Sequence, residues 1–217
     1  MLIISFLNPK GGSGKTTLST NVARAFHERG CKVLLVDSDP QGSASDWHAA
    51  RDDNPIPLIA YGKPENLKAL PGVAAPYDYA LVDGAAKLEA MIAAVVKVSD
   101  AVLIPVQPSP YDIWAVSDLV DLIKARQEVT EGKPKAAFVI CRAIKRTILG
   151  REVASALAEY RLPALNAFTA QRQSYPRTAA DGLTVFDNGN QEAAAEIRAI
   201  ADELSCLLRP GQASHVA

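Results

Sequence analysis

The chain carries a glycine-rich stretch near its start, Lys10-Gly11-Gly12-Ser13-Gly14-Lys15-Thr16-Thr17. It follows an apolar run, residues 2–7, and precedes a segment whose apolar residues recur at helical spacing. In such a loop the glycines let the backbone approach a bound group, and N–H groups together with the helix N-terminus bind an anion. The formal pattern of a phosphate-binding loop is not met, because no glycine stands five positions before Gly14. The place between a strand and a helix nevertheless predicts that residues 10–17 hold phosphate.

The side chains of this loop add chemistry that a plain turn does not need. Lys15 is placed to reach the β- and γ-phosphates of a nucleotide, and the Thr16 hydroxyl is placed to ligate Mg²⁺. The alternative is a glycine-rich turn without a ligand, which would leave two lysines and two threonines at this spacing unexplained. We therefore predict ATP and Mg²⁺ as ligands, and we interpret Asn8 as an ordinary loop residue.

Five near-continuous apolar runs alternate with helical patterns along the chain. Continuous apolar runs suit strands that are buried on both faces of a parallel sheet. The alternation predicts an α/β fold with a doubly wound, mostly parallel sheet flanked by helices through right-handed crossovers. The predicted strands are residues 2–7, 33–37, 79–83, 101–106 and 136–141. The predicted helices carry apolar residues at Leu18, Val22, Ala25 and Phe26, at Ile113, Val116, Val120 and Ile123, and at Ile197, Ile200, Leu204 and Leu207.

The remaining segments and the composition complete the prediction. Residues 51–77 are rich in Pro and Gly with weak periodicity, which indicates a loop-rich excursion. We expect a single domain over residues 1–208 and a flexible C-terminal tail over residues 209–217. The three cysteines lie far apart and form no metal-ligand pair, which favours a reduced, cytosolic compartment.

Aspartates stand at the ends of two predicted strands. Asp37 and Asp39 follow one apolar run, and Asp83 follows another. Ligands of open α/β sheets bind beyond the carboxyl ends of the strands, so these carboxylates are expected to face the phosphate loop. A strand-ending aspartate is often only a turn or a helix cap, but two such ends beside a phosphate loop favour a ligand site. Asp112, which follows a proline-rich turn, is interpreted as a helix N-cap.

These motifs resemble the deviant Walker ATPases of the ParA/MinD superfamily, in particular the short, ParF-like ParA proteins of plasmid partition. The loop K-G-G-x-G-K-T-T resembles their deviant Walker A box. D-x-D-P-Q-G at residues 37–42 resembles their Walker A′ motif, and V-D-G at residues 82–84 resembles Walker B. The resemblance implies a P-loop NTPase fold and an ATP-sandwich homodimer. Because Gly84-Ala85-Ala86 departs from the usual sequence after Walker B, we expect the γ-phosphate switch to differ in detail.

The resemblance also implies roles for individual residues. Lys10 would cross the dimer interface to the partner's nucleotide and stabilise charge as an arginine finger does elsewhere. Asp39 would position the attacking water, so the catalytic residues are expected to be Lys10, Lys15 and Asp39. The metal site would be served by Thr16, Asp37, Asp39 and Asp83.

Two later segments resemble the loops that flank the base in short ParA proteins. Residues 167–175 carry their T-x-Q-R-Q-x-Y sequence, and Arg142 stands at the place of their arginine after a strand. The resemblance therefore implies that Arg142, Phe168 and Thr169 lie beside adenine. They would add to the contacts of the phosphate loop, which are Lys10, Gly11, Gly12, Ser13, Gly14, Lys15, Thr16 and Thr17.

The charge of the chain is unevenly distributed. The formal net charge is −1, yet residues 124–177 hold eleven lysines and arginines against four glutamates. Such asymmetry indicates a polyanionic partner, although charged residues usually form solvated helix faces and loops. The resemblance to ParA proteins, with this charge in support, implies sequence-independent binding to DNA phosphates. The predicted last helix is acidic, which disfavours a membrane-binding helix with a basic face. The candidates for DNA contact are Lys145, Arg146, Arg151, Arg172 and Arg177.

We predict a partition ATPase that hydrolyses ATP slowly, dimerises with ATP and binds DNA without sequence specificity. It would segregate a plasmid or chromosome with a centromere-binding, ParB-like partner that stimulates hydrolysis, and it would be cytoplasmic and nucleoid-associated. One alternative is a ParA-like ATPase that positions another cargo, such as a protein cluster or secretion or cellulose machinery. A second alternative, from another class, is an ATP-dependent ligase for small molecules.

Overall fold

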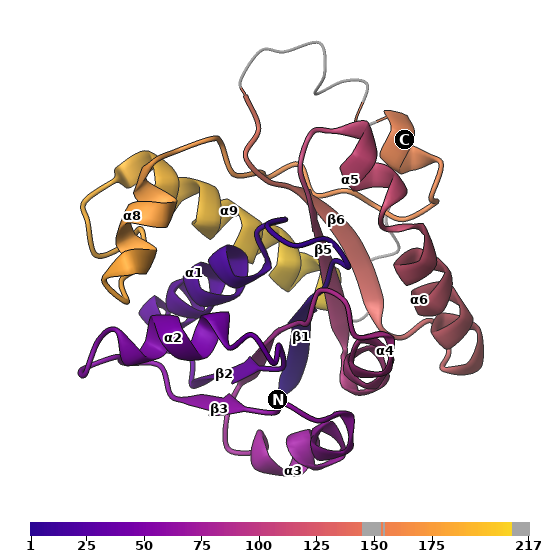
Figure 1. Ribbon diagram of the computed structural model, residues 1–217, viewed down its shortest axis with the longest axis horizontal. Coiled ribbons are helices and arrows are strands. Elements are labelled where there is room, and N and C mark those ends of the chain that lie inside the picture. The colour runs from indigo at the N-terminus through magenta and orange to yellow at the C-terminus, as the bar shows by residue number, and fades with distance from the viewer. Residues whose placement is uncertain (145–152, 154, 210–217) are drawn as a thin grey trace.

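The strands form one parallel sheet in the computed structural model, which describes residues 1–144, 153 and 155–209. The strand order is β3-β2-β4-β1-β5-β6, with β1 inside the sheet between β4 and β5 (Figure 1). This arrangement confirms the predicted doubly wound, parallel α/β fold. The bounds are β1 (Leu2–Phe6), β2 (Val33–Asp37), β3 (Leu58–Ala60), β4 (Tyr79–Asp83), β5 (Ala101–Val106) and β6 (Lys135–Ile140).

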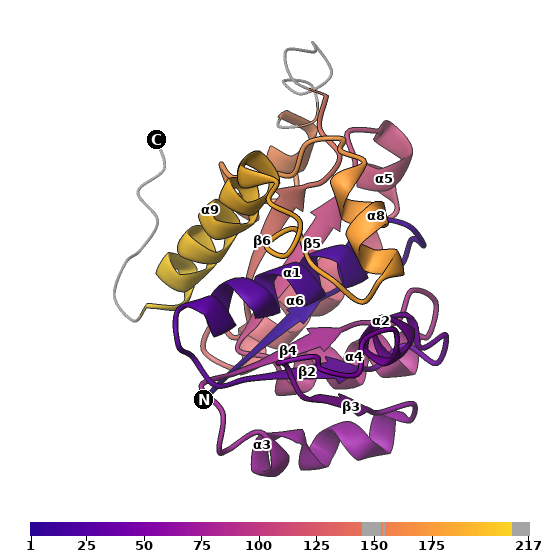
Figure 2. The ribbon, with the colours of Figure 1, turned by 90° about the vertical axis from the view of Figure 1, so that its left-hand side faces the viewer.

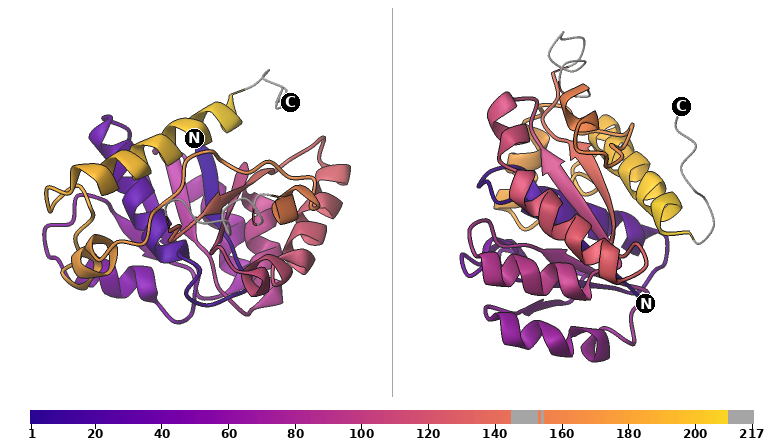
Figure 3. Two further views of the ribbon diagram at one scale, coloured as in Figure 1. Left: turned by 90° about the horizontal axis from the view of Figure 1, so that it is seen from above. Right: turned by 90° about the vertical axis from the view of Figure 1, so that its right-hand side faces the viewer.

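Helices cover both faces of the sheet in two distinct groups. One face carries α1 (Lys15–Glu28), α2 (Ser43–Ala49), α8 (Ser174–Ala180) and α9 (Gln191–Leu208), with α1, α8 and α9 in front in Figure 2. The right panel of Figure 3 turns the other group toward the viewer. That group comprises η1 (Pro64–Ala69), α3 (Leu70–Val73), α4 (Glu89–Val98) and α6 (Ser117–Val129), and the short α5 (Pro110–Trp114) precedes α6.

Neighbouring residues of each strand belong to different hydrophobic cores. Ile3 packs with the group of α4 and α6, whereas Ile4 packs with the group of α1 and α9. Leu34 and Leu35 divide between the two cores in the same way. Because successive side chains of a strand point to opposite faces, a strand covered on both sides must be apolar throughout. This requirement explains the continuous apolar runs.

Two predictions for the secondary structure were wrong. Residues 51–77 are not only loop, because β3 extends the sheet beside β2 and η1 and α3 cover its edge. The helix predicted over Ile113 to Ile123 is two helices, since the Val116 N–H donates to the Ile113 carbonyl in a tight turn between α5 and α6. β3 has only three residues, which is too short for a periodic pattern. The helical spacing of apolar residues continues across the turn between α5 and α6, so the sequence does not reveal that turn.

The topology places a crevice at the carboxyl end of β1. The chain leaves β1 through α1 toward β2 on one side, and later passes from β4 through α4 to β5 on the other side. Ligands of open α/β sheets bind where the winding reverses in this way. Within the described residues no helix is long and apolar enough to cross a membrane. The predicted tail lies outside the described residues except for Arg209.

Candidate functional site

The loop between β1 and α1, residues 10–17, has the backbone of an anion cradle and is called the phosphate loop below. Gly14 is the N-cap of α1 at φ 107°, and Gly12 has φ 74°. Both values lie in the left-handed region that side chains with a Cβ rarely adopt. A Cβ on Gly14 would also stand 3.3 Å from the Cys141 sulfur. The loop therefore needs glycine for its path and for its close approach to the end of β6.

Contacts of two side chains, Asn8 and Gln107, fix the phosphate loop to the end of β5. The Asn8 side chain, which is fully buried, donates to the Pro105 carbonyl at 2.7 Å and accepts from the Lys10 N–H at 2.7 Å. The Gln107 amide donates to the Gly12 carbonyl at 2.7 Å. Our interpretation of Asn8 as an ordinary loop residue was therefore wrong. Its role was not visible in the sequence because its partner is distant in the chain.

Lys15 is buried at the bottom of the phosphate loop. The side chain begins α1, and Nζ donates to the Lys10 carbonyl at 3.2 Å. Burial lowers the pKa of the Lys15 amine, and the charges of Asp83 and Asp39 oppose that effect. A desolvated ammonium beside backbone N–H groups attracts an anion strongly, because little solvent screens it.

Asp83, at the end of β4, is fully buried next to the start of α1. Its Oδ2 accepts from the Thr16 hydroxyl at 2.6 Å, and its Oδ1 has no hydrogen-bond partner. Burial raises the pKa of Asp83 to about 7, Thr16 and Lys15 lower it, and Asp37 and Asp39 raise it further. A carboxylate with an unpaired buried oxygen is costly unless a cation or a proton compensates it.

Magnesium fits this arrangement through few protein ligands. No group of three or more His, Cys, Asp or Glu side chains able to hold a metal occurs among the described residues. Mg²⁺ usually keeps several waters and binds through one or two protein oxygens together with phosphates. The Thr16 hydroxyl and the unpaired oxygen of Asp83 supply such oxygens.

Asp37 and Asp39 lie close together but have different surroundings. Oδ2 of Asp37 accepts from the Ser45 N–H at 2.8 Å and the Ser45 hydroxyl at 2.6 Å, and its Oδ1 accepts from the Asp39 N–H. Asp37 thus shapes the turn into α2. Asp39 is only half-buried, and its Oδ1 accepts from the Gln41 N–H. Of the two, Asp39 has the carboxylate that lines the cleft described below.

Lys10 forms an ion pair within the chain. Its Nζ lies 2.5 Å from Oδ2 of Asp112, and the two side chains are 41% and 4% exposed. The prediction that Asp112 caps a helix was wrong, because Ser109 is the N-cap of α5 and Asp112 stands inside the first turn. Asp112 is the third residue of α5, and its carboxylate points away from the helix toward Lys10 of the phosphate loop.

Gly84, the glycine that follows Asp83, stands where there is no room for a side chain. A Cβ at this position would lie 2.2 Å from a methyl carbon of Leu7 and 2.8 Å from the Phe6 carbonyl. The Gly84 N–H donates to that carbonyl at 3.1 Å, so β4 and β1 remain in contact past their ends. Ala86, two residues on, reaches the lining of the cleft.

A cleft of about 740 Å³ opens over the phosphate loop. It lies between α2 and α8 and extends along the first turns of α1. A side hollow of about 250 Å³ adjoins it between the end of β6 and residues 169–176. The cleft is lined by Gly11, Gly12, Gly14, Lys15, Thr16, Thr17, Thr20, Asn21, Asp39, Gln41, Ser43, Asp46, Trp47, Ala50, Ala86, Arg142, Tyr175, Pro176, Ala179 and Ala180.

Of the three residues predicted beside adenine, two line the cleft or the side hollow and one does not. Arg142 lines both spaces, and Thr169 lines the side hollow, where its hydroxyl accepts from the Arg142 N–H at 3.2 Å. Phe168 is absent from the lining of both, because neighbouring side chains of an extended segment point to opposite sides. Sequence reasoning missed Cys141 and Tyr175, which line the side hollow. Tyr175 stood in the quoted T-x-Q-R-Q-x-Y sequence.

The residues predicted to contact DNA are placed very differently. Arg172 is ion-paired with Glu192 at 2.6 Å and Glu196 at 2.8 Å, so its charge is already compensated within the chain. Arg177 is exposed on α8. Lys145, Arg146 and Arg151 lie outside the described residues.

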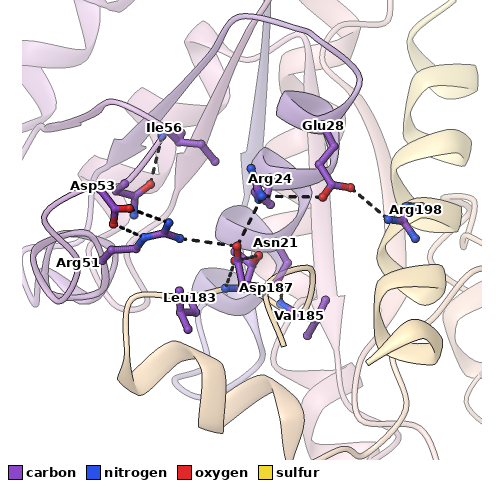
Figure 4. A network of polar contacts seen from close by, with 12 residues as sticks. Asn21, Arg24, Glu28, Arg51, Asp53, Ile56, Leu183, Val185, Asp187 and Arg198 are labelled. Carbon is purple, nitrogen blue, oxygen red and sulfur yellow. Dashed lines mark hydrogen bonds and ion pairs between the residues drawn. The ribbon is translucent and has the colours of Figure 1, made fainter. Parts of the chain in front are cut away.

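A polar network joins residues 183–187 to the wall of the cleft (Figure 4). The Asn21 side chain accepts from the Val185 N–H at 3.0 Å, and the Trp47 indole donates to the Leu183 carbonyl at 3.0 Å. Asp187 accepts from the Thr184 N–H and hydroxyl. Asp187 also lies 3.5 Å from Arg24 and 3.6 Å from Arg51, and Arg24 in turn belongs to α1. The loop thereby braces α1 against α2.

We predict that this brace weakens in acid. Burial raises the pKa of Asp187, but the Thr184 hydrogen bonds and the Arg24 and Arg51 charges outweigh burial and leave it below its ordinary value. A lowered pKa means that the ionised carboxylate stabilises the fold at neutral pH, and that this contribution is lost as the pH falls through the folded pKa. Asp187→Asn should therefore lower the free energy of unfolding at pH 7 by about 1.5–3 kcal/mol.

Thermal unfolding between pH 7 and pH 3 measures this effect. The stability difference between the natural chain and Asp187→Asn should shrink toward acid, because protonation removes the same charge. Asp52→Asn, which removes an exposed carboxylate nearby, is the matched control. A difference that stays constant down to pH 3 contradicts the prediction.

Known proteins are similar to this chain over most of its length. The profile described as the CobQ/CobB/MinD/ParA nucleotide binding domain matches residues 4–185. "Maintenance of carboxysome distribution protein A" of Halothiobacillus neapolitanus is 31% identical over 209 residues, which cover 94% of each chain. "Chromosome partitioning protein ParA" of Myxococcus xanthus is 29% identical over 168 residues, which cover 56% of this chain and 59% of that protein.

Solved structures share the fold at low sequence identity. An aspartate-to-alanine variant of McdA from Cyanothece in complex with ATP has a TM-score of 0.78 at 14% identity, covering 94% of this chain and 96% of that one. Cobyrinic acid a,c-diamide synthase of Mycobacterium smegmatis with ADP and magnesium has a TM-score of 0.77 at 22% identity, covering 98% and 97%. The predicted ligands, ATP and Mg²⁺, are of the kinds that these structures hold. The chain belongs to the CobQ/CobB/MinD/ParA nucleotide-binding family, which confirms the resemblance to the ParA/MinD superfamily.

Proposed function

We propose that this chain is an ATP-driven switch of the ParA type that positions a protein assembly. The observation that carries the proposal is the similarity to a carboxysome distribution protein over 94% of both chains. Two chromosome-partitioning proteins are 29% and 27% identical over 56% and 71% of this chain. These findings favour the alternative of a protein cargo over the plasmid or chromosome cargo that we predicted. DNA segregation with a centromere-binding, ParB-like partner is the second candidate.

Nucleotide binding in this proposal depends on the phosphate loop, and residues 1–208 act as one ATPase unit. Backbone N–H groups and the N-terminus of α1 hold the phosphates, and Lys15 supplies a desolvated positive charge. Thr16 and Asp83 hold magnesium, which when bound neutralises charge on the phosphates. Asp39 orients the attacking water from the edge of the cleft. Hydrolysis then rests on positioning and electrostatics.

In this proposal Lys10 is the residue that couples ATP binding to dimerisation. Its side chain is 41% exposed and is held by Asp112 in the single chain. In the proposed ATP-sandwich dimer Lys10 leaves Asp112 and reaches the nucleotide of the partner subunit. ATP binding is thereby coupled to dimerisation, and hydrolysis, stimulated by an adaptor protein of the cargo, releases the dimer.

The dimer is proposed to hold nucleoid DNA through phosphate contacts. Arg177 is exposed on α8 and is available for such a contact. The basic residues Lys145, Arg146 and Arg151 would add to it. Arg172 is a weaker candidate, because Glu192 and Glu196 compensate its charge. Binding that neutralises phosphates falls steeply as the salt concentration rises.

Lys10→Ala tests the switch. The variant should bind ATP but should remain a monomer by light scattering, and it should lose ATP-dependent DNA binding at every salt concentration. Lys63→Ala, which removes another exposed lysine, should behave as the natural chain does. An ATP-dependent dimer of Lys10→Ala, or a natural chain that binds no DNA with any nucleotide, would contradict this part of the proposal.

Deletion of the gene distinguishes the two cargoes. If the cargo is a protein assembly, fluorescently tagged assemblies should cluster while plasmids and chromosomes are inherited normally. If the cargo is DNA, the frequency of cells without the plasmid or chromosome should rise instead. The second outcome overturns the proposal in favour of partition.

A further inference from the structure

Helix α9 directs two carboxylates toward the chain segment that runs beside β6. Glu203 accepts from the Asn166 and Ala167 N–H groups, each at 2.8 Å. Glu196, two turns earlier, accepts from the Ala170 N–H at 3.1 Å. Backbone N–H groups need hydrogen-bond partners, and here α9 rather than another strand provides them. Two of the acidic residues that make the last helix unlike a membrane-binding helix therefore hold a neighbouring segment of the chain.

Glu196 makes three further contacts that Glu203 does not make. Its Oε1 accepts from Arg172 Nε at 2.9 Å and from Arg172 Nη2 at 2.8 Å. Its Oε2 accepts from the Tyr175 hydroxyl at 2.9 Å. Burial and the charge of Glu196 raise the pKa of Tyr175, so the phenol stays protonated and donates. The Glu196 side chain is only 13% exposed, and its carboxylate binds the Ala170 N–H, the Arg172 guanidinium and the Tyr175 hydroxyl together.

The partners of Glu196 form one wall of the side hollow. Ala170, Arg172 and Tyr175 all line it, whereas Asn166 and Ala167, the partners of Glu203, do not. The opposite wall is Gly14 and Thr17 of the phosphate loop and its helix. A nucleotide whose phosphates lie in that loop has its base and ribose within reach of this hollow. The carboxylates Asp39 and Asp83 do not line it, so the hollow is separate from the site of hydrolysis.

We propose that Glu196 is a positioning residue that sets the base subsite of this ATPase. It holds residues 170–175 in the shape that contacts the base and ribose of a nucleoside triphosphate, without touching the phosphates. The inference rests on the proposed function, because it assumes that the phosphate loop binds a nucleotide. It predicts that the affinity for the base depends on Glu196 and that the affinity for the phosphate chain does not.

Glu196→Ala and Glu203→Ala form a matched pair. Each removes a carboxylate of α9 that holds the same extended segment, but only the partners of Glu196 line the side hollow. Isothermal titration calorimetry with ATP and with tripolyphosphate separates the base from the phosphates. Glu196→Ala should weaken ATP binding on the order of 10-fold or more. Its tripolyphosphate affinity should stay within about twofold of that of the natural chain. Glu203→Ala should retain both affinities.

Glu196→Gln keeps the experiment informative if the alanine variant folds poorly. Its amide oxygen can still accept from Tyr175, but the charge that holds Arg172 is lost, so an intermediate loss of ATP affinity is expected. Equal weakening of ATP and tripolyphosphate, or an equal effect of Glu203→Ala, would assign Glu196 a merely structural role and overturn the inference. If the natural chain binds ATP no more tightly than tripolyphosphate, the inference is overturned as well. Failure of the natural chain to bind either ligand would instead refute the proposed function.

Discussion

Lys15→Ala should lower the affinity for ATP on the order of 100-fold or more, because it removes a buried ammonium from the phosphate site. Lys15 as a residue is 7% exposed, and its Nζ donates only to the Lys10 carbonyl among the contacts that the described residues make. Its donors and its charge are therefore available to phosphate oxygens. Equilibrium binding of a fluorescent ATP analogue measures the loss.

The same variant should not be less stable without nucleotide. Burial lowers the pKa of Lys15, so the charged amine is less favourable in the folded chain than in the unfolded chain. Removing it relieves that cost, and the midpoint of thermal unfolding should be unchanged or higher. Lys63→Ala serves as the control for both measurements. If Lys15→Ala binds ATP as tightly as the natural chain does, residues 10–17 are not the phosphate site.

Asp39→Ala should slow ATP hydrolysis on the order of 100-fold, since the attacking water loses the carboxylate that orients it. ATP affinity should stay within about threefold, because Asp39 does not hold the phosphates. The variant should therefore accumulate as an ATP-bound dimer. Single-turnover hydrolysis together with light scattering measures both effects.

Asp46→Ala is the matched control for Asp39→Ala. Asp46 lines the same cleft from α2 but lies outside the turn that carries Asp37 and Asp39. Its loss should leave hydrolysis within about twofold of the natural rate. If both variants slow hydrolysis equally, the effect comes from the charge of the cleft and not from water positioning.

The sequence predicted the parts of the molecule that local patterns determine. Strands covered on both faces must be apolar throughout, and a glycine-rich loop before a helix shows its function in its spacing. The strand-ending Asp83 was found for the same reason, because parallel strands bring their ends together. These features need no knowledge of how distant segments meet.

What could not be predicted depends on contacts between distant segments. Asn8 looks like any loop residue until Pro105 is placed beside it. Arg172 looks like a surface cation until α9 brings Glu196 to it. Phe168 was predicted beside adenine, but the direction of its side chain depends on the register of the extended segment with β6. In each case the missing information was the tertiary partner and not the residue itself.

The attachment of the phosphate loop to β5 has a consequence for synthesis of the chain. The loop is translated early, but its shape depends on Pro105 and Gln107, and β1 pairs with β4 and β5 instead of a nearby strand. Pairing of distant strands delays folding, since long loops must close first. A nascent chain on the ribosome should thus gain nucleotide affinity only after residue 107 has left the exit tunnel. From that point ATP itself stabilises the folded state by mass action.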